Sequence, residues 1–174
     1  ELLSIDHLSD FPDHPKKLIS NLKTLNKIHF FTFPIFIKKY AKKLFCFYSI
    51  PYNFFVNKNK IDLVFIDGPP YYYNGREAAL HSCFEYLSPN AIIILDDANR
   101  INYERIYIKK WKYRYGDNLD IKLFEKEFKK GMCLIIKNDK KNDLRNYTFF
   151  DQISFSASTL FRLIKLFLGK ILKR

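Results

Sequence analysis

Apolar residues are concentrated in two short runs in the middle of the chain, Ile61–Ile66 and Ala91–Leu95. Short runs rich in branched and aromatic apolar residues predict strands buried on both faces, in the middle of a sheet that helices cover on both sides. The intervening residues 75–87 combine helix-forming residues with helical apolar spacing, and Ser88–Asn90 predicts the end of that helix. The pattern therefore predicts a strand–helix–strand unit with two parallel strands.

Acidic residues close both predicted strands: Asp67 follows the first, and Asp96 and Asp97 follow the second. In open parallel sheets, ligands bind beyond the carboxyl ends of the strands. We therefore expect the three carboxylates to face one crevice. Because Asp96 and Asp97 are adjacent, their side chains should point in different directions, and one of them is placed to cap the next helix.

Further elements surround this unit. Short apolar runs predict strands at residues 2–5, 28–33, 121–128 and 132–137, and three- and four-residue spacings predict helices at residues 16–25 and 102–115. Gly116 is placed to end the second helix, and Lys129–Gly131 predicts a hairpin turn between the last two strands. The fold class is therefore α/β, with a doubly wound, mostly parallel sheet that closes in an antiparallel hairpin.

Two segments mix basic residues with large apolar ones. Residues 35–48 predict either a basic amphipathic helix or an inserted flap. Residues 155–174 carry basic residues and no acid, which is typical of a helix on an acidic membrane surface; packing on the domain or on a partner subunit explains them equally well. We expect an α/β domain at residues 1–137, and a charged linker with a basic C-terminal helix at residues 138–174.

The composition is basic, with 30 Lys and Arg against 18 Asp and Glu and a formal charge of +12. This charge favours an anionic partner, such as nucleic acid, acidic lipid or an acidic substrate, or it serves solubility alone. Cys46, Cys83 and Cys133 are too dispersed for a zinc site and fit a reducing compartment. We expect a cytoplasmic protein, with peripheral contact to the inner membrane face as an option.

Three segments resemble class I S-adenosylmethionine-dependent methyltransferases: LLSIDH at residues 2–7, IDLVFIDGPP at 61–70 and AIIILDDANR at 91–100. They are similar to that family's second, fourth and fifth strands, and the closing hairpin is similar to its sixth and seventh. The resemblance covers residues 1–137 and implies a Rossmann-like fold with S-adenosylmethionine as the cofactor. It is closest to sugar and small-molecule O-methyltransferases, which implies methylation of an oxygen of a small-molecule or saccharide acceptor.

The family's glycine-rich loop after the first strand has no counterpart among the five glycines of this chain. The chain also opens without Met, on a strand that already ends in Asp6. We therefore expect an N-terminally truncated domain, whose first strand and glycine-rich loop lie before Glu1, and poor cofactor binding by this chain alone.

The resemblance assigns the cofactor site to Asp6, His7, Asp67 and Gly68. Asp6 would accept hydrogen bonds from two ribose hydroxyls, for which a carboxylate offers two oxygens. Asp67 would orient the acceptor or act as a base, with Asp97 as the second catalytic candidate. Gly68 would let the backbone approach a ligand closely.

Substrate contacts are expected from Pro69, Tyr71, Arg76 and Arg100. The two arginines would clamp an anionic group of the acceptor, or would instead pair with nearby acids.

A magnesium site is a further expectation. Asp67, Asp96 and Asn99 offer the hard oxygen ligands that Mg²⁺ prefers, as in related metal-dependent O-methyltransferases.

Two alternative functions stay open. Pro69-Pro70-Tyr71 is similar to the Asp-Pro-Pro-Tyr motif of amino-methyltransferases that act on nucleic acid bases, although here Gly68 separates the acid from the prolines; nucleic acid is the weaker alternative. The other alternative is a non-catalytic, truncated relative that binds an acidic membrane or a partner protein.

Overall fold

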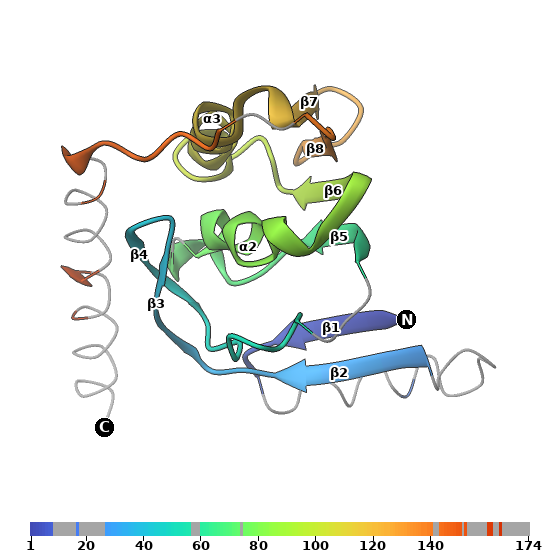
Figure 1. The fold of residues 1–174 in the computed structure, drawn as a ribbon, viewed down its shortest axis with the longest axis vertical. Coiled ribbons are helices and arrows are strands. Elements are labelled where there is room, and N and C mark those ends of the chain that lie inside the picture. The colour runs from blue at the N-terminus through green and yellow to red at the C-terminus, as the bar shows by residue number, and fades with distance from the viewer. Residues whose placement is uncertain are drawn as a thin grey trace.

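The computed structural model describes residues 1–8, 17, 27–56, 60–73, 75–140, 143–150, 152, 160, 161 and 164. Two strands at the N-terminus, β1 (Leu2–Asp6) and β2 (Ile28–Thr32), pair in parallel. A second sheet has the order β5–β6–β8–β7, formed by β5 (Ile61–Ile66), β6 (Leu87–Asp96), β8 (Met132–Lys137) and β7 (Leu119–Phe124). All these strands lie roughly side by side (Figure 1). Among the described residues, no strand pairs with the second edge of β1 or of β5.

The predicted strand–helix–strand unit is confirmed. Strands β5 and β6 are parallel, and α2 (Arg76–Cys83) with a 3-10 turn at Phe84–Tyr86 connects them. The helix is shorter than predicted, because Leu87 already pairs with Ile61 and the next residues extend β6 backwards. Ser88–Asn90 therefore begins a strand instead of ending a helix, and Asn90 takes a positive φ of 60° there.

The C-terminal half also follows the prediction in its main features. Helix α3 (Glu104–Tyr115) ends at Gly116, whose φ of 52° combined with a ψ of −127° is a conformation that glycine adopts far more readily than other residues. Strands β7 and β8 form the predicted antiparallel hairpin on the edge of the parallel pair. Their connection spans residues 125–131 and is longer than the predicted turn. The fold is thus a Rossmann-like α/β sheet that is parallel in its first strands and closes in an antiparallel hairpin.

Residues 35–48 form the flap, and the helical alternative for them is wrong. Strands β3 (Ile35–Tyr40) and β4 (Lys43–Tyr48) pair antiparallel across a two-residue turn. Ala41 and Lys42 both have positive φ, 49° and 64°, as in the tight turns that match the twist of a hairpin. Strand β4 is buried almost throughout, which a surface helix could not achieve for consecutive residues. The predicted loop and helix at residues 11–25 lie outside the described residues, apart from Lys17.

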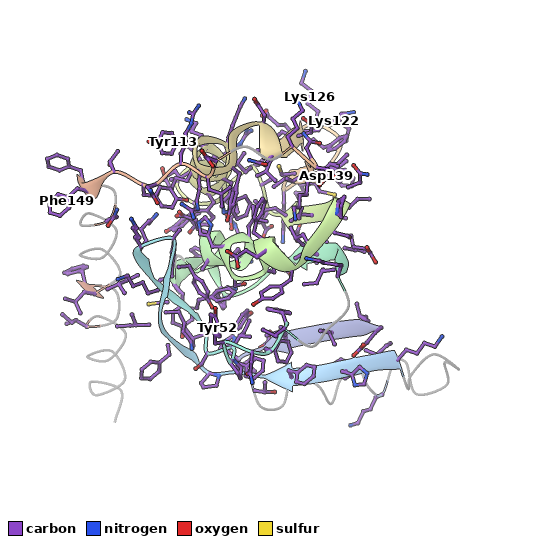
Figure 2. The ribbon with its side chains drawn as sticks, in the orientation of Figure 1. Tyr52, Tyr113, Lys122, Lys126, Asp139 and Phe149 are labelled. Carbon is purple, nitrogen blue, oxygen red and sulfur yellow. The ribbon has the colours of Figure 1, made fainter. Side chains whose placement is uncertain are left out.

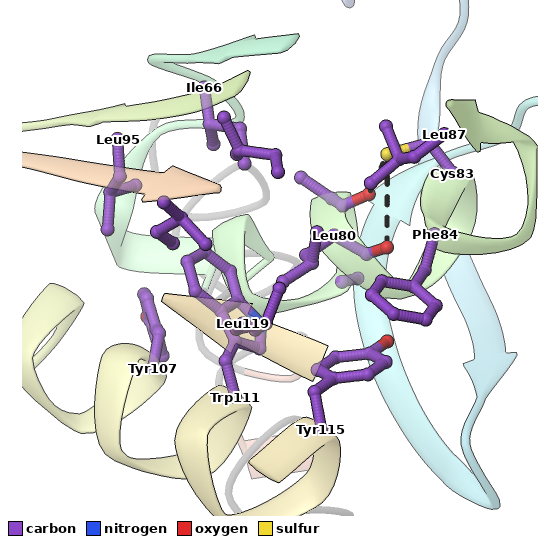
Figure 3. Close-up of a cluster of buried hydrophobic side chains, with 14 of the residues drawn as sticks. Ile66, Leu80, Cys83, Phe84, Leu87, Leu95, Tyr107, Trp111, Tyr115 and Leu119 are labelled. Atoms are coloured by element: carbon purple, nitrogen blue, oxygen red, sulfur yellow. Dashed lines mark hydrogen bonds between the residues drawn. The ribbon is translucent and has the colours of Figure 1, made fainter. Parts of the chain in front are cut away.

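Helices cover one face of the four-stranded sheet, and side chains fill the space between them (Figure 2). Ile66 and Leu95 point to that side, toward Leu80 of α2 and Trp111 of α3 (Figure 3), and Ile135 belongs to the same buried cluster. On the other face, large apolar residues are exposed in the described structure: Leu63, Phe65 and Ile92. The described helices α2 and α3 lie on one face of this sheet, so helical cover of the other face stays a prediction.

A buried ionic network fastens the β3–β4 hairpin to the helices. Lys43 Nζ donates to Glu77 Oε1 over 2.8 Å, and both side chains are fully buried. Tyr147 donates to the same oxygen over 3.2 Å and lies 3.0 Å from His81 Nε2, so the network also includes residues of the predicted linker. Lys110 of α3 reaches Glu77 Oε2 at 3.4 Å. Three elements and the segment at Tyr147 therefore converge on one carboxylate.

The pKa values in this network move in the direction set by these contacts. Burial opposes the ionisation of Glu77, but the hydrogen bond from His81 and the charges of Lys43 and Lys110 outweigh it and lower the pKa of Glu77 to about 2. Burial lowers the pKa of Lys43 to about 8, partly offset by Glu77. Both groups are therefore charged at neutral pH.

Glu77→Gln should make the free energy of unfolding less dependent on pH in the acidic range. Because the folded-state pKa of Glu77 lies below its ordinary value of 4.5, its contribution is complete above that pH and is lost as the pH falls toward 2. The loss should reach about 3 kcal/mol in the free energy of unfolding, measured by urea titration across this range. The exposed Glu85→Gln is the matched control. Equal acid sensitivity in the two variants would contradict the role of Glu77.

Candidate functional site

Three aspartates meet where β5 and β6 end. Asp67 follows β5, Asp96 is the last residue of β6, and Asp97 comes next; each places a carboxylate oxygen within 4.8 Å of the others. The predicted convergence is confirmed. It follows from the parallel pairing of β5 with β6, which brings both strand ends to the same sheet edge.

Arg76 lies under this cluster and holds it together. Its Nη2 donates to Asp67 Oδ1 over 3.1 Å, while Nη1 donates to Glu104 Oε1 over 3.0 Å and contacts Asp97 Oδ2 at 3.5 Å. Its Nε donates to the carbonyl oxygen of Pro69 over 3.1 Å. The side chain is buried, so these contacts commit it to the protein itself. This geometry favours the pairing interpretation of Arg76, and its proposed contact with a substrate stays a prediction.

Asp97 is the most enclosed of the three aspartates. Arg100 contacts its Oδ2 at 2.5 Å, and Lys130 lies 3.5 Å from its Oδ1. That Oδ1 is buried and has no hydrogen-bond partner in the structure. Asp97 caps no helix, because α3 begins seven positions later with Tyr103 as its N-cap. Its φ of 57° instead marks a sharp turn that directs it away from the course of β6.

Burial raises the pKa values of two carboxyl groups at this site, those of Asp67 and Glu104. Burial raises the pKa of Asp67, and the carboxylates of Asp96 and Asp97 raise it further, while Arg76 opposes them. Burial also raises the pKa of Glu104, again opposed by Arg76. A carboxylate with a raised pKa is a stronger base, which is the property that the sequence assigned to Asp67.

A second acidic position lies at the end of β1. The Oδ1 of Asp6 accepts hydrogen bonds from the backbone N–H groups of His7, over 2.6 Å, and Leu8, over 2.9 Å. No described residue donates to its Oδ2. The ring of His7 lies 6.5 Å from that of Tyr48 and 6.2 Å from that of Tyr73. Asp6 is therefore fixed by its own turn with one oxygen available for a ligand.

Tyr48 connects the two acidic positions, and sequence reasoning missed it. This buried residue of β4 is close enough to Asp6 and Asp67 for both carboxylates to raise the pKa of its hydroxyl, after the larger effect of burial. A Cβ on Gly68 would lie 2.1 Å from the Tyr48 hydroxyl oxygen. The space beside Gly68 is thus filled by Tyr48, which is a different role from the close backbone approach to a ligand that the sequence suggested.

Aromatic and basic side chains border the site on the side of α3. The Arg100 guanidinium lies 5.0 Å from the ring centroid of Tyr71, and Tyr103 meets the same ring edge-on at 5.1 Å. Tyr71 is partly exposed, whereas Pro69 is fully buried. Tyr71 and Arg100 thus remain at the surface of the predicted substrate site, and Pro69 supports it from inside through its contact with Arg76.

Asn99 points toward the β7–β8 connection. Its Nδ2 donates to the Glu125 carbonyl over 3.1 Å, and its Oδ1 accepts from Arg105 over 3.4 Å. Gly131 packs against it, since a Cβ there would lie 2.4 Å from the Asn99 amide carbon. The structure therefore groups Asp67 and Asp96 with Asp97, while Asn99 is held by other partners.

Two hollows in the surface lie away from these residues. One of about 560 Å³ is bordered by Tyr113, Asp120 and Arg145, and one of about 240 Å³ by Lys110 and Tyr147. The aspartate cluster sits at an open sheet edge. In the described part of the chain, no helix is long and apolar enough to span a membrane.

The fold is like that of class I S-adenosylmethionine-dependent methyltransferases. A methyltransferase from Geobacter sulfurreducens is similar with a TM-score of 0.52 and 14% identity, over 78% of this chain and 57% of the other. An O-methyltransferase from Bacillus cereus in complex with SAH is similar with a TM-score of 0.56 and 10% identity, over 78% of this chain and 62% of the other. The chain thus spans about three fifths of these proteins, and at this identity the likeness shows the fold. No family model and no curated protein matches the chain.

Gly68→Ala should destabilise the protein by about 1–3 kcal/mol, the usual cost of overpacking, because the new methyl group collides with the Tyr48 hydroxyl. Adding Tyr48→Phe removes the colliding oxygen and should restore much of the loss in a double-mutant cycle of urea unfolding. The control is Tyr48→Phe alone. Additive losses in the double variant would show that the Tyr48 hydroxyl does not restrict position 68.

Proposed function

We propose that the protein is an S-adenosylmethionine-dependent methyltransferase that methylates an oxygen of a small-molecule or saccharide acceptor. The observation that carries the proposal is the placement of Asp6 at the end of β1 and of Asp67 directly after β5, both near the Tyr48 hydroxyl, in a methyltransferase-like fold. The fold likeness to an O-methyltransferase in complex with SAH supports the same cofactor class.

Asp6 would bind the ribose of the cofactor. Its Oδ1 is held by two backbone N–H groups, so the carboxylate is oriented before a ligand arrives. Two ribose hydroxyls are donors that match a carboxylate. His7, packed between the rings of Tyr48 and Tyr73, would border the same ligand.

Asp67 would hold the proton that the acceptor hydroxyl loses. When bound, S-adenosylmethionine supplies an electrophilic methyl group. Asp67 pairs with Arg76 through Oδ1 and is exposed, so it can reach an acceptor. Its raised pKa makes it more basic than an ordinary aspartate, while Arg76 keeps it oriented. Asp97 is enclosed by Arg76, Arg100 and Lys130, so it would act by fixing these cations.

Binding of SAH to the protein, expressed from its complete reading frame, tests the cofactor assignment by calorimetry. Asp6→Asn removes the charge from two hydrogen bonds and should weaken binding about 10- to 100-fold. Asp120→Asn, at an exposed position of β7, should leave binding unchanged. The proposal fails if folded protein binds no SAH, or if both variants bind like the wild type.

Mg²⁺ would be a second ligand of the same edge, held mainly by Asp67 and Asp96. Asp67, Asp96 and Asp97 each place a carboxylate oxygen within 4.8 Å of the others, a cluster that suits a hard cation, and the ion would polarise an acceptor oxygen there. Asp96→Asn should abolish the heat of MgCl₂ titration, because Asp96 makes none of the ion pairs that occupy Asp97. Asp120→Asn is again the control, and equal heats in wild type and Asp96→Asn would exclude this site.

A non-catalytic protein that binds an acidic membrane is the second candidate. Leu160, Phe161 and Ile164 are exposed, and they lie in residues 155–174, which carry no acid. These are the features of a helix at a membrane surface. A folded protein that binds anionic vesicles and no SAH would favour this candidate.

A further inference from the structure

The β3–β4 hairpin has an unusual charge distribution. Residues 35–48 contain four lysines and no acid. Lys43 turns inward to Glu77, but Lys39 and Lys42 are exposed and Lys38 is half-buried. Two lysines, Lys39 and Lys42, are therefore exposed on the hairpin, and the same segment contains no acidic residue.

Large apolar side chains stand among these lysines. Phe36 is 67% exposed, and Ile37 and Leu44 are each more than a third exposed. Lys39 pairs with Leu44 across the hairpin, and Ile37 is two positions from Lys39, so these three side chains share one face. In water this arrangement leaves apolar surface uncovered next to cations.

The hairpin is a firmly held platform. Phe45 and Phe47 are buried in the core, and Lys43 is bonded to Glu77. Its turn at Ala41 and Lys42 has the positive φ values of a tight hairpin turn. The outer side chains are therefore presented in a fixed arrangement, which lowers the entropic cost of binding a partner.

Residues 148–150 extend this surface beside the turn. The Tyr147 ring lies 4.4 Å from Lys43 Nζ, which brings the following residues next to the hairpin. Phe149 is 70% exposed and Phe150 is 82% exposed, and Figure 2 shows Phe149 reaching outward on that side of the molecule. Cationic and aromatic side chains thus continue from one segment to the other.

This chemistry fits a lipid surface better than a nucleic acid. Ile37 and Leu44 have no aromatic ring that could stack on a base. Their transfer from water to the boundary between lipid headgroups and acyl chains is favourable, because it buries apolar surface. The hairpin offers lysines and no arginine, and so lacks the planar fork that reads bases and phosphates bidentately. Lysine ammonium groups suit lipid phosphates as point charges.

We propose that one face of the β3–β4 hairpin, formed by Ile37, Lys39 and Leu44 with Lys42 of the turn, docks on an anionic lipid bilayer. The proposal goes beyond the methyltransferase activity and does not depend on it. The hairpin would lie on the headgroups, with its apolar side chains inserted and its lysines against lipid phosphates.

Co-sedimentation of the full chain with vesicles tests the docking surface. The protein should bind phosphatidylcholine vesicles that contain phosphatidylglycerol, and should not bind pure phosphatidylcholine. Lys39→Gln with Lys42→Gln should lower partitioning by about five-fold for each lysine at low salt. Ile37→Ser should lower it by about ten-fold. Thermal unfolding confirms that each variant is folded.

Matched variants elsewhere separate this surface from general charge. Lys122→Gln with Lys126→Gln removes the same charge on the far side of the molecule, where Figure 2 labels both residues, and should leave binding unchanged. Ile101→Ser is the control for Ile37→Ser, since it removes the same side chain from an exposed position outside the hairpin. Equal losses in the hairpin pair and the control pair would overturn the proposal.

Two further outcomes would also overturn it. If Lys165→Gln with Lys170→Gln abolishes vesicle binding and the hairpin variants bind like the wild type, residues 155–174 make the membrane contact alone. If the hairpin variants lose affinity for a single-stranded oligonucleotide and keep their affinity for vesicles, the surface binds nucleic acid.

Discussion

The buried guanidinium of Arg76 is the contact on which the acidic sheet edge depends. Asp67, Asp97 and Glu104 would repel one another at these separations without a cation between them, and burial makes that repulsion stronger. The fixed fork of an arginine can bond to several acceptors at once, which the point charge of a lysine cannot reproduce. Its bond to the Pro69 carbonyl adds the loop after β5 to the same unit. The site is therefore organised by a buried residue whose guanidinium group bonds to the protein on several sides.

Helix α2 links this edge to the hairpin through two adjacent residues. Arg76 opens the helix and holds the acids of the site, while Glu77 holds Lys43 of β4, His81 and Tyr147. The start of the helix is pinned as well, because a Cβ on Gly75 would lie 2.1 Å from the carbonyl oxygen of Cys46. Any displacement of the hairpin would thus be transmitted to the first turn of α2, and through Arg76 to Asp67.

The sequence was sufficient for features that depend on local pattern and on general topology. Apolar runs located β5 and β6, and the rule for strand ends placed Asp67, Asp96 and Asp97 together. The sequence was insufficient for interactions between residues that lie far apart along the chain. Lys43 and Glu77 are 34 positions apart, and neither has a neighbour that reveals the pair. The lysine spacing in residues 35–48 also fits one face of an amphipathic helix. Only the burial of consecutive β4 residues, which the structure shows, distinguishes the hairpin from that helix.

The charge of the site differs in sign from that of the chain. Four carboxyl groups (Asp67, Asp96, Asp97 and Glu104) surround three cations there, Arg76, Arg100 and Lys130, although the whole chain carries +12. An edge with a surplus of carboxylate suits a cationic ligand, and a sulfonium is one. The excess of basic residues must therefore lie elsewhere, and the hairpin is one place where it is exposed beside apolar side chains. The basic composition is accordingly no argument for an anionic substrate, because it describes a surface that is separate from the acidic sheet edge.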